Sequence, residues 1–228
     1  MKYYPICLDI QNRDCLVVGG GAVAARKVKT LLECGARVTV VSPAFTDELK
    51  EMKMENPSLT LVQRPYESSD VAGRFLVIGA TDNETLNRTI SRDAEENNLL
   101  CNIADFPEAC NFILPSIVKQ GDLMLAITTS GSSPAFAKHL RKKLEKAFGE
   151  EYIDFLKLMR RVRKILLDTG HAPEEHKPLF EQLINNGLLD LVRENKTAEI
   201  NRLLHETVGD LLGDHCDYEK LMHSREDR

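Results

Sequence analysis

The sequence predicts an α/β protein: a Rossmann-like, doubly wound parallel sheet, followed by a hairpin-helix segment and a C-terminal helical domain. Strand-like and helix-like segments alternate over residues 1–113. A glycine-rich turn lies between the first strand and the first helix. After Asn111 the alternation stops, and two β-prone runs are followed by helices alone. We therefore expect three parts, at residues 1–113, 114–149 and 150–228.

The first part is expected to hold buried strands that are short, apolar and rich in Val, Leu and Ile. They cover residues 15–18, 38–41, 59–62, 75–80 and 99–104. The helices between them are expected at residues 22–34, 46–54 and 84–97. Gly35 should end the first helix, and Asp82 should cap the third. Such alternation is typical of parallel β-α-β units.

The second and third parts follow a different pattern. Phe112–Val118 and Leu123–Thr129 predict a hairpin, because a Gln-Gly-Asp turn separates the two apolar runs. Ser133 should cap a helix that begins at Pro134 and ends near Gly149. Further helices are expected at about residues 155–166, 177–185, 188–194 and 197–212, and the polar tail 215–228 should fray.

Composition narrows the class of protein. Of 228 residues, 43% are hydrophobic and 29% are charged, as in ordinary globular domains, and no apolar run approaches a membrane span. The six cysteines form no C-x-x-C pair, and no leader-like apolar run opens the chain, so we expect reduced thiols and a cytoplasmic protein. We expect neither a nucleic-acid nor a membrane partner.

Charge is unevenly distributed along the chain. Residues 114–164 hold eleven basic and five acidic side chains, a local charge of +6 within a protein of net charge −5. A basic zone can attract an anionic ligand even when the whole molecule is negative. A solvated helical face explains the same pattern, so both interpretations stay open.

The most informative local motif is Gly19-x-Gly21-x-x-Ala24, which follows a strand and opens a helix. The first glycine permits the tight turn, the second lets the backbone approach a pyrophosphate, and Ala24 permits close packing of helix on strand. The amides around Ala22 and Val23 would then bind the phosphates. A glycine turn that serves packing alone is the competing explanation.

The acid that usually binds the cofactor ribose is missing, because Ser42 stands at the end of the second strand. We expect the ribose to contact the Ser42 hydroxyl and the backbone at Pro43 and Ala44. No Arg or Lys lies between Thr39 and Glu48, so no clamp for a 2′-phosphate is evident. This favours NAD over NADP.

Five runs together are more specific than the glycine turn. They resemble the N-terminal region of siroheme synthase, that is, the precorrin-2 dehydrogenase / sirohydrochlorin ferrochelatase family, over about residues 1–150. The runs are Asp14–Lys27 (DCLVVGGGAVAARK), Gly79–Asp82 (GATD), Cys101–Asp105 (CNIAD), Asn111–Ser116 (NFILPS) and Ser130–Pro134 (SGSSP).

The resemblance implies an NAD-dependent dehydrogenase of siroheme biosynthesis, in which a hydride passes from precorrin-2 to NAD and sirohydrochlorin is formed. It also implies ferrous iron insertion in some members, and an intertwined homodimer with the hairpin and following helix as its dimerisation segment. It assigns the family's key aspartate to Asp105, at the ligand-binding edge of the sheet, and adds Thr81 to the cofactor contacts. A turn aspartate that only caps local amides is the alternative.

Substrate contacts follow from the same resemblance. A tetrapyrrole that carries carboxylates suits the basic segment, because Arg binds carboxylates bidentately. The expected contacts are Thr129, Ser130, Ser132, Lys138 and Arg141. Thr129 stands where the family often has serine. No metal-ligating cluster is evident, so chelatase activity is left open. A non-enzymatic NAD-sensing module with the same fold is the alternative from another class.

Overall fold

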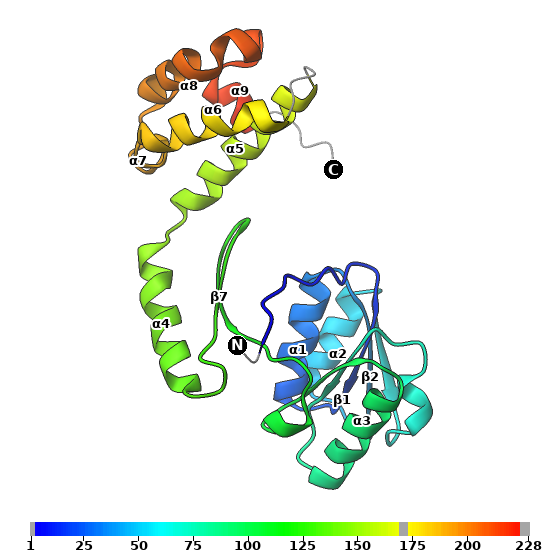
Figure 1. Cartoon of the computed structure of the whole chain (residues 1–228). Coiled ribbons are helices and arrows are strands. Elements are labelled where there is room, and N and C mark those ends of the chain that lie inside the picture. Colours follow the sequence, from blue (N-terminus) through cyan, green and yellow to red (C-terminus); the bar gives the residue numbers. More distant parts are fainter. Residues whose placement is uncertain (1–2, 169–172, 224–228) are drawn as a thin grey trace. The chain divides into compact units, whose positions relative to one another are not determined.

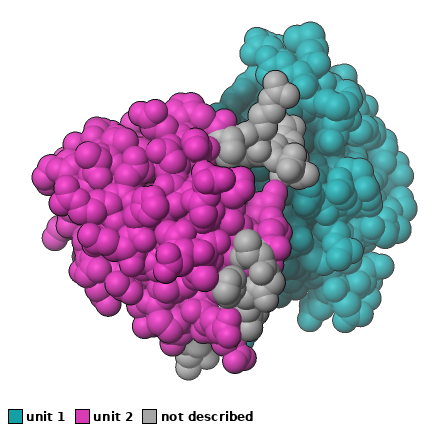
Figure 2. Space-filling model, turned by 90° about the horizontal axis from the view of Figure 1, so that it is seen from above, with its two compact units in different colours: residues 1–114 teal, residues 115–228 magenta. Residues whose placement is uncertain are grey.

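A computed structural model describes residues 3–168 and 173–223 of the chain. Figure 1 gives the order of the helices and strands. The chain forms two compact units, residues 1–114 and 115–228, which are coloured separately in Figure 2. The separation of a dimerisation segment from a helical domain within residues 115–228 stays a prediction.

The first unit contains a five-stranded parallel sheet with the strand order β3-β2-β1-β4-β5. The strands are β1 (Asp14–Val18), β2 (Arg37–Ser42), β3 (Leu59–Gln63), β4 (Leu76–Gly79) and β5 (Leu100–Ile103). The crossovers contain α1 (Ala22–Glu33), α2 (Asp47–Glu55), the 3₁₀ turn η1 (Ser68–Val71) and α3 (Glu84–Glu96). The strand order reverses between β1 and β4, and this confirms the predicted Rossmann-like sheet.

Both faces of this sheet are covered, because successive side chains of a strand point to opposite faces. In β1, Cys15 and Val17 pack with Ala24, Ala25 and Val28 of α1 on one face. On the other face, Leu16 and Val18 pack in a second cluster with Ile90 and Ala94 of α3. The strands are therefore apolar throughout, as expected for a buried parallel sheet.

Local signals set most helix ends correctly. Gly35, with φ 77°, follows the last turn of α1 and donates its amide to the Leu32 carbonyl, as predicted. The cap of α3 was predicted one residue too early: Asn83, not Asp82, accepts the Leu86 amide at 3.0 Å. Asn and Asp cap helices about equally well, so composition alone does not separate these neighbours.

The second unit begins with an antiparallel hairpin of β6 (Ser116–Gln120) and β7 (Leu123–Ile127), in which Gly121 turns with φ 58°. The predicted start at Phe112 is wrong. Phe112 packs against the core of the first unit instead, and its carbonyl accepts a hydrogen bond from Asn102. The β-prone run therefore crosses the boundary between the units.

Helices make up the rest of the second unit. As predicted, Ser133 caps the helix that begins at Pro134, accepting the Phe136 amide at 3.2 Å. The helices are α4 (Pro134–Ala147), α5 (Glu151–Asp168), α6 (Pro173–Asn185), α7 (Leu188–Arg193), α8 (Thr197–Leu212) and α9 (Tyr218–His223), with the 3₁₀ turn η3 (Gly213–His215). Apolar side chains of α5, α7 and α8 form its core.

The prediction that residues 215–228 fray is wrong for residues 215–223. Cys216 and Leu221 are buried against the helical core, and α9 packs on α5. Tyr218 and Met222 also pack against this core, so apolar side chains anchor the stretch. Residues 224–228 lie outside the described part of the chain. Within the described residues, no helix is long and apolar enough to cross a membrane.

Candidate dinucleotide site

A cleft of about 1140 Å³ lies in the first unit, at the carboxyl ends of the strands. It is lined by residues 18–23, 41–43, 65–66, 80–84, 86–87 and 104–106. These segments follow all five strands, and the glycine turn after β1 lies at the point where the strand order reverses. Open α/β sheets bind their ligands at this place.

The three consecutive glycines of the turn have different roles. A Cβ atom at Gly19, which has φ 122°, would lie 2.2 Å from the Ala80 carbonyl oxygen. A Cβ atom at Gly20 would lie 1.9 Å from the Ala44 carbonyl oxygen. A Cβ atom at Gly21 would have no neighbour within 4 Å. The chain itself therefore requires glycine at the first two positions, whereas Gly21 leaves open space on the cleft.

The N-terminus of α1 offers unpaired donors to this space. Gly21 is the N-cap residue, it provides no side-chain cap, and the first turn has no acidic residue. Ala25 makes the first intrahelical hydrogen bond, to the Gly21 carbonyl, which leaves the amides of Ala22 and Val23 without an intrahelical acceptor. Together with the helix dipole, these amides are suited to an anionic group such as a pyrophosphate.

Of the three residues predicted to contact the ribose, two line the cleft. Ser42 is buried at the end of β2 and lines the cleft with Pro43. Ala44 is not part of the lining, and its carbonyl faces Gly20 instead. On the other side of the turn, Thr81 lines the cleft and donates its hydroxyl to the buried Asn87 Oδ1 at 2.8 Å. The Asn87 Nδ2 returns a hydrogen bond to the Thr81 carbonyl at 3.0 Å.

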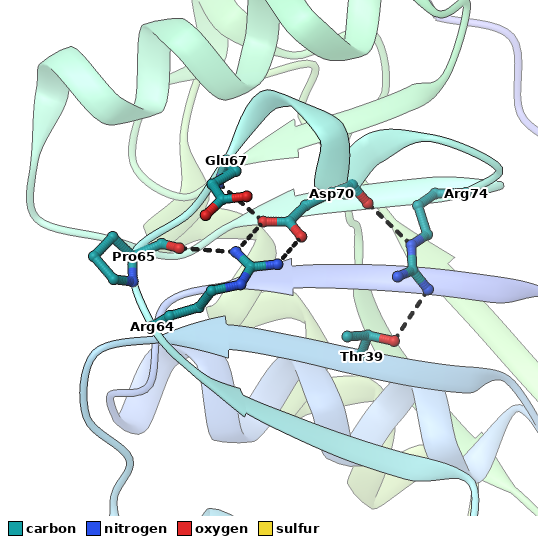
Figure 3. Close-up of polar contacts among 6 residues, drawn as sticks. All are labelled: Thr39, Arg64, Pro65, Glu67, Asp70 and Arg74. Atoms are coloured by element: carbon teal, nitrogen blue, oxygen red, sulfur yellow. Dashed lines mark hydrogen bonds and ion pairs between the residues drawn. The ribbon is translucent and has the colours of Figure 1, made fainter.

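One wall of the cleft, which sequence reasoning missed, follows β3 and contains Pro65 and Tyr66. Figure 3 shows how this loop is held: Arg64 donates two hydrogen bonds to the Asp70 carboxylate, at 2.8 and 2.5 Å. The Glu67 amide donates to the same carboxylate at 2.9 Å. The signal that could have indicated this wall is an aromatic residue, Tyr66, just after the strand β3.

Arg74 ties the far end of this loop to the sheet. Its guanidinium donates to the Asp70 carbonyl at 3.1 Å and to the Thr39 hydroxyl of β2 at 3.0 Å (Figure 3). The Arg64 guanidinium also donates to the Pro65 carbonyl at 2.9 Å. The wall is therefore fixed before any ligand binds, which reduces the entropy cost of binding.

Asp105 lies where the sequence places it, in the cleft and two residues beyond β5. It is exposed and adopts a left-handed backbone with φ 59°, a conformation that Asp and Asn tolerate better than other non-glycine residues. The Lys27 ammonium of α1 interacts electrostatically with it. Burial and Arg26 lower the pKa of Lys27, and the negative charge of Asp105 partly offsets this.

The predicted substrate residues belong to the second unit and lie at the start of α4. The Thr129 hydroxyl accepts the Ser133 amide at 3.0 Å, Ser130 has φ 53°, and Ser132 and Lys138 are exposed. The guanidinium of Arg141 forms an ion pair with Glu145 on its own helix. Thr129 therefore shapes the loop before α4, and Arg141 would have to leave Glu145 to bind a substrate carboxylate.

Metal ligation is not evident in the parts of the chain that the structure describes, because no group of three His, Cys, Asp or Glu residues is placed to hold an ion. All six cysteines are free, and Cys15, Cys101 and Cys216 are buried. Burial raises the pKa of the Cys101 thiol to about 12.

A parallel sheet of this strand order, with an uncapped helix beside a glycine turn, defines a dinucleotide-binding protein of the Rossmann class.

Comparisons with known proteins define the family. Residues 6–116 match the family model described as putative NAD(P)-binding, and residues 120–147 match the model described as sirohaem biosynthesis protein central. A solved structure of SirC, precorrin-2 dehydrogenase, superposes with a TM-score of 0.76 at 26% identity, covering 90% of this chain and 98% of that one.

Siroheme synthases are similar in sequence. The protein of Shigella boydii serotype 18 (strain CDC 3083-94 / BS512) is 34% identical over 96% of this chain and 47% of its own length. The siroheme synthase of Citrobacter koseri (strain ATCC BAA-895 / CDC 4225-83 / SGSC4696) is 37% identical, over 87% of this chain and 43% of its own length. The chain thus spans a little less than half the length of these relatives. It belongs to the siroheme biosynthesis family in which an NAD(P)-binding domain precedes the sirohaem central region.

Proposed function

We propose that the protein is a precorrin-2 dehydrogenase, which oxidises precorrin-2 to sirohydrochlorin with NAD. The single observation that carries this proposal is the cleft in which Gly21, the α1 amides and Asp105 lie together, on a chain that covers 98% of a solved precorrin-2 dehydrogenase.

The cleft fits the cofactor. Gly21 leaves room for the pyrophosphate, and the amides at the start of α1 are free to bind it. Ser42 and Pro43 would face the adenosine ribose, and Thr81 would lie on the other side of the turn. NAD, when bound, supplies the hydride acceptor. Arg64 already pairs with Asp70, so it is not available as a clamp for a 2′-phosphate, and this supports NAD rather than NADP.

Asp105 is the proposed catalytic residue. A hydride that leaves the macrocycle must be accompanied by loss of a proton from a ring carbon or a pyrrole nitrogen, and a carboxylate at the cleft can accept that proton. The Lys27 ammonium of α1 supplies a positive charge near this carboxylate. The same carboxylate would serve iron insertion, in which pyrrole nitrogens lose protons as the metal enters.

The proposed substrate contacts are the loop at residues 129–132 and the basic face of α4. Lys138 and Arg141 lie on α4 and could pair with the carboxylates that a tetrapyrrole carries. We also propose that the protein is a homodimer. Its support is a set of exposed apolar side chains on the hairpin and the adjacent helices, namely Ile117, Met124, Phe136 and Ile153.

Anaerobic incubation of the purified protein with precorrin-2 and NAD tests the proposal. We expect NADH to form in a one-to-one ratio with sirohydrochlorin. Addition of ferrous iron after the first reaction then shows whether siroheme forms. Binding of NAD without any NADH formation would contradict the dehydrogenase and favour an NAD-sensing module.

A further inference from the structure

β5 is the edge strand of the sheet, and its open edge is covered by side chains rather than by another strand. Ala104 donates its amide inward to the Gly79 carbonyl of β4. Because backbone groups alternate along a strand, the amides of Cys101 and Ile103 point away from β4. Unpaired groups on such an edge require partners.

Asn111 supplies partners for the first part of this edge. Its Oδ1 accepts the Cys101 amide at 2.8 Å, and its Nδ2 donates to the Leu99 carbonyl at 2.7 Å. Its own amide donates to the Cys101 carbonyl at 3.1 Å. One residue thus satisfies three backbone groups and fixes the point at which the chain returns after the Asp105 turn.

Cys110 supplies partners for the second part, nearest to Asp105. Its Sγ accepts the Ile103 amide at 3.1 Å and lies 3.4 Å from the Ile103 carbonyl oxygen and 3.3 Å from that of Phe106. The thiol proton can be donated to only one of these carbonyls at a time. The sulfur therefore contacts both Ile103 and Phe106, the two residues that flank Ala104 and Asp105, and holds the ends of this turn together.

Asp105 depends on this closure. Among the residues that the structure describes, none makes a hydrogen bond or an ion pair with its carboxylate, and its backbone has φ 59°. Its position in the cleft therefore depends on the backbone of the turn from Ile103 to Cys110. Ser91 of α3 adds a further tie, donating to the Ala109 carbonyl at 3.0 Å.

We infer that Cys110 and Asn111 are positioning residues for the reaction: they hold the left-handed turn that places the Asp105 carboxylate in the cleft. The inference rests on the proposed function, in which Asp105 accepts a proton. A displacement of about 1 Å in a reacting group can cost on the order of a hundredfold in rate. Covering an edge strand is the simpler role, and it predicts an effect on stability alone.

The test uses the full-length protein with Cys110→Ala, which removes the sulfur, and Cys110→Ser, which keeps a donor and an acceptor. Cys34→Ala is the matched control, because Cys34 lies at the far end of α1. For each protein, kcat, KM for both substrates, the Kd of NAD and the thermal midpoint are measured. Each substitution is repeated in an Asp105→Asn background.

We expect Cys110→Ala to lower kcat by about tenfold, with partial recovery in Cys110→Ser and an unchanged Kd for NAD. Asp105→Asn should cost less in the Cys110→Ala protein than in the parent, because both changes act through one carboxylate. If the two losses simply multiply, or if kcat stays at the parent value, the positioning role is wrong.

An inactive parent protein would refute the proposed function instead, so the two failures are distinguishable. If Cys110→Ala does not fold, the same comparison with and without Asp105→Asn is made with Cys110→Ser and with Asn111→Asp. Asn111→Asp keeps the acceptor for the Cys101 amide and loses the donor to the Leu99 carbonyl. The same criterion, a kcat loss coupled to Asp105, then decides the question.

Discussion

The hydroxyl of Tyr66, on the wall of the cleft, donates a 2.9 Å hydrogen bond to the buried carboxylate of Asp93 on α3. Burial raises the pKa of Asp93, but hydrogen bonds from Ser68, Tyr66 and Arg92 outweigh it and hold this pKa below its ordinary value. Burial, and after it the same contact, raise the pKa of Tyr66. An ionised carboxylate in the interior thus orients an aromatic ring at the ligand surface.

Replacement of Tyr66 separates the two parts of this contact. Tyr66→Phe keeps the ring, so NAD affinity should change by less than about threefold, while the free energy of unfolding falls by about 1–2 kcal/mol because Asp93 loses one donor. Tyr66→Ala also removes the ring and should weaken NAD binding by up to about tenfold. Calorimetric titration and urea denaturation measure both quantities. Equal NAD affinity in all three proteins would remove Tyr66 from the site.

Substitutions in the glycine turn should separate folding from binding. Gly20→Ala places a Cβ against the Ala44 carbonyl and should destabilise the protein by about 1–3 kcal/mol or more. Gly21→Ala meets nothing within 4 Å, and Gly21 has an ordinary φ of −88°, so the thermal midpoint should stay near that of the parent.

NAD binding, in contrast to stability, should be sensitive to a change at Gly21. Gly21→Asp puts a carboxylate where the pyrophosphate is expected, and NAD affinity should fall at least about a hundredfold. Titration of NAD into the folded variant measures this. Unchanged affinity in Gly21→Asp would mean that the cofactor does not bind at this turn.

Asp105→Asn tests the proposed proton acceptor. Asn tolerates the left-handed backbone at φ 59° and is nearly isosteric, so the fold and NAD affinity should be kept. Turnover should fall by roughly 10²–10⁴-fold, because the amide cannot take a proton. Steady-state rates of NADH formation and of iron insertion are the readouts. Full activity in both assays, or a collapsed thermal midpoint, would assign Asp105 a purely structural role.

Stability should depend on pH through Asp70. Its pKa lies below the ordinary value, chiefly because Arg64 donates to the carboxylate. A lowered pKa in the folded state stabilises the protein above the ordinary Asp pKa of about 4, and this contribution is lost as the pH falls through the folded-state value. Asp70→Asn should therefore be destabilising by about 1–3 kcal/mol at pH 7.

The difference between Asp70→Asn and the parent should shrink at pH 3, because the Asp70 carboxyl of the unfolded parent is then largely protonated and must lose its proton on folding. Urea denaturation at both pH values measures it. Asp47→Asn is a suitable control, since Asp47 pairs with Lys50 on the exposed surface of α2 and should change stability little at either pH. A difference that is the same at pH 3 and pH 7 would show that the charge of Asp70 is unimportant.

The hairpin tests the proposed dimer. Ile117 and Met124 are exposed on β6 and β7, and burial of such side chains is the main favourable term in association. Sedimentation at micromolar concentration should show a particle of twice 25.7 kDa, and Met124→Asp should shift it towards 25.7 kDa. A parent protein that sediments as a monomer would defeat this prediction.

Local patterns were sufficient for the elements of the first unit. Apolar runs predicted its strands within about two residues, and Gly35 marked the end of α1 through backbone chemistry that needs only neighbouring residues. The glycine motif marked the turn that lines the cleft, and the family resemblance, together with its position after a strand, singled out Asp105. These features depend on short stretches of chain, in which spacing and residue type carry the information.

Long-range contacts decided the rest. Phe112 has the composition of a strand residue, yet it packs on the first unit, and only the tertiary structure assigns it there. Gly20 is required by the Ala44 carbonyl, Tyr66 is oriented by Asp93, and Cys110 satisfies the edge of β5. Each of these roles is defined by an atom distant in sequence or hidden in a turn. Periodicity reports which face of an element is buried, but not which backbone group or carboxylate lies on the other side of the contact.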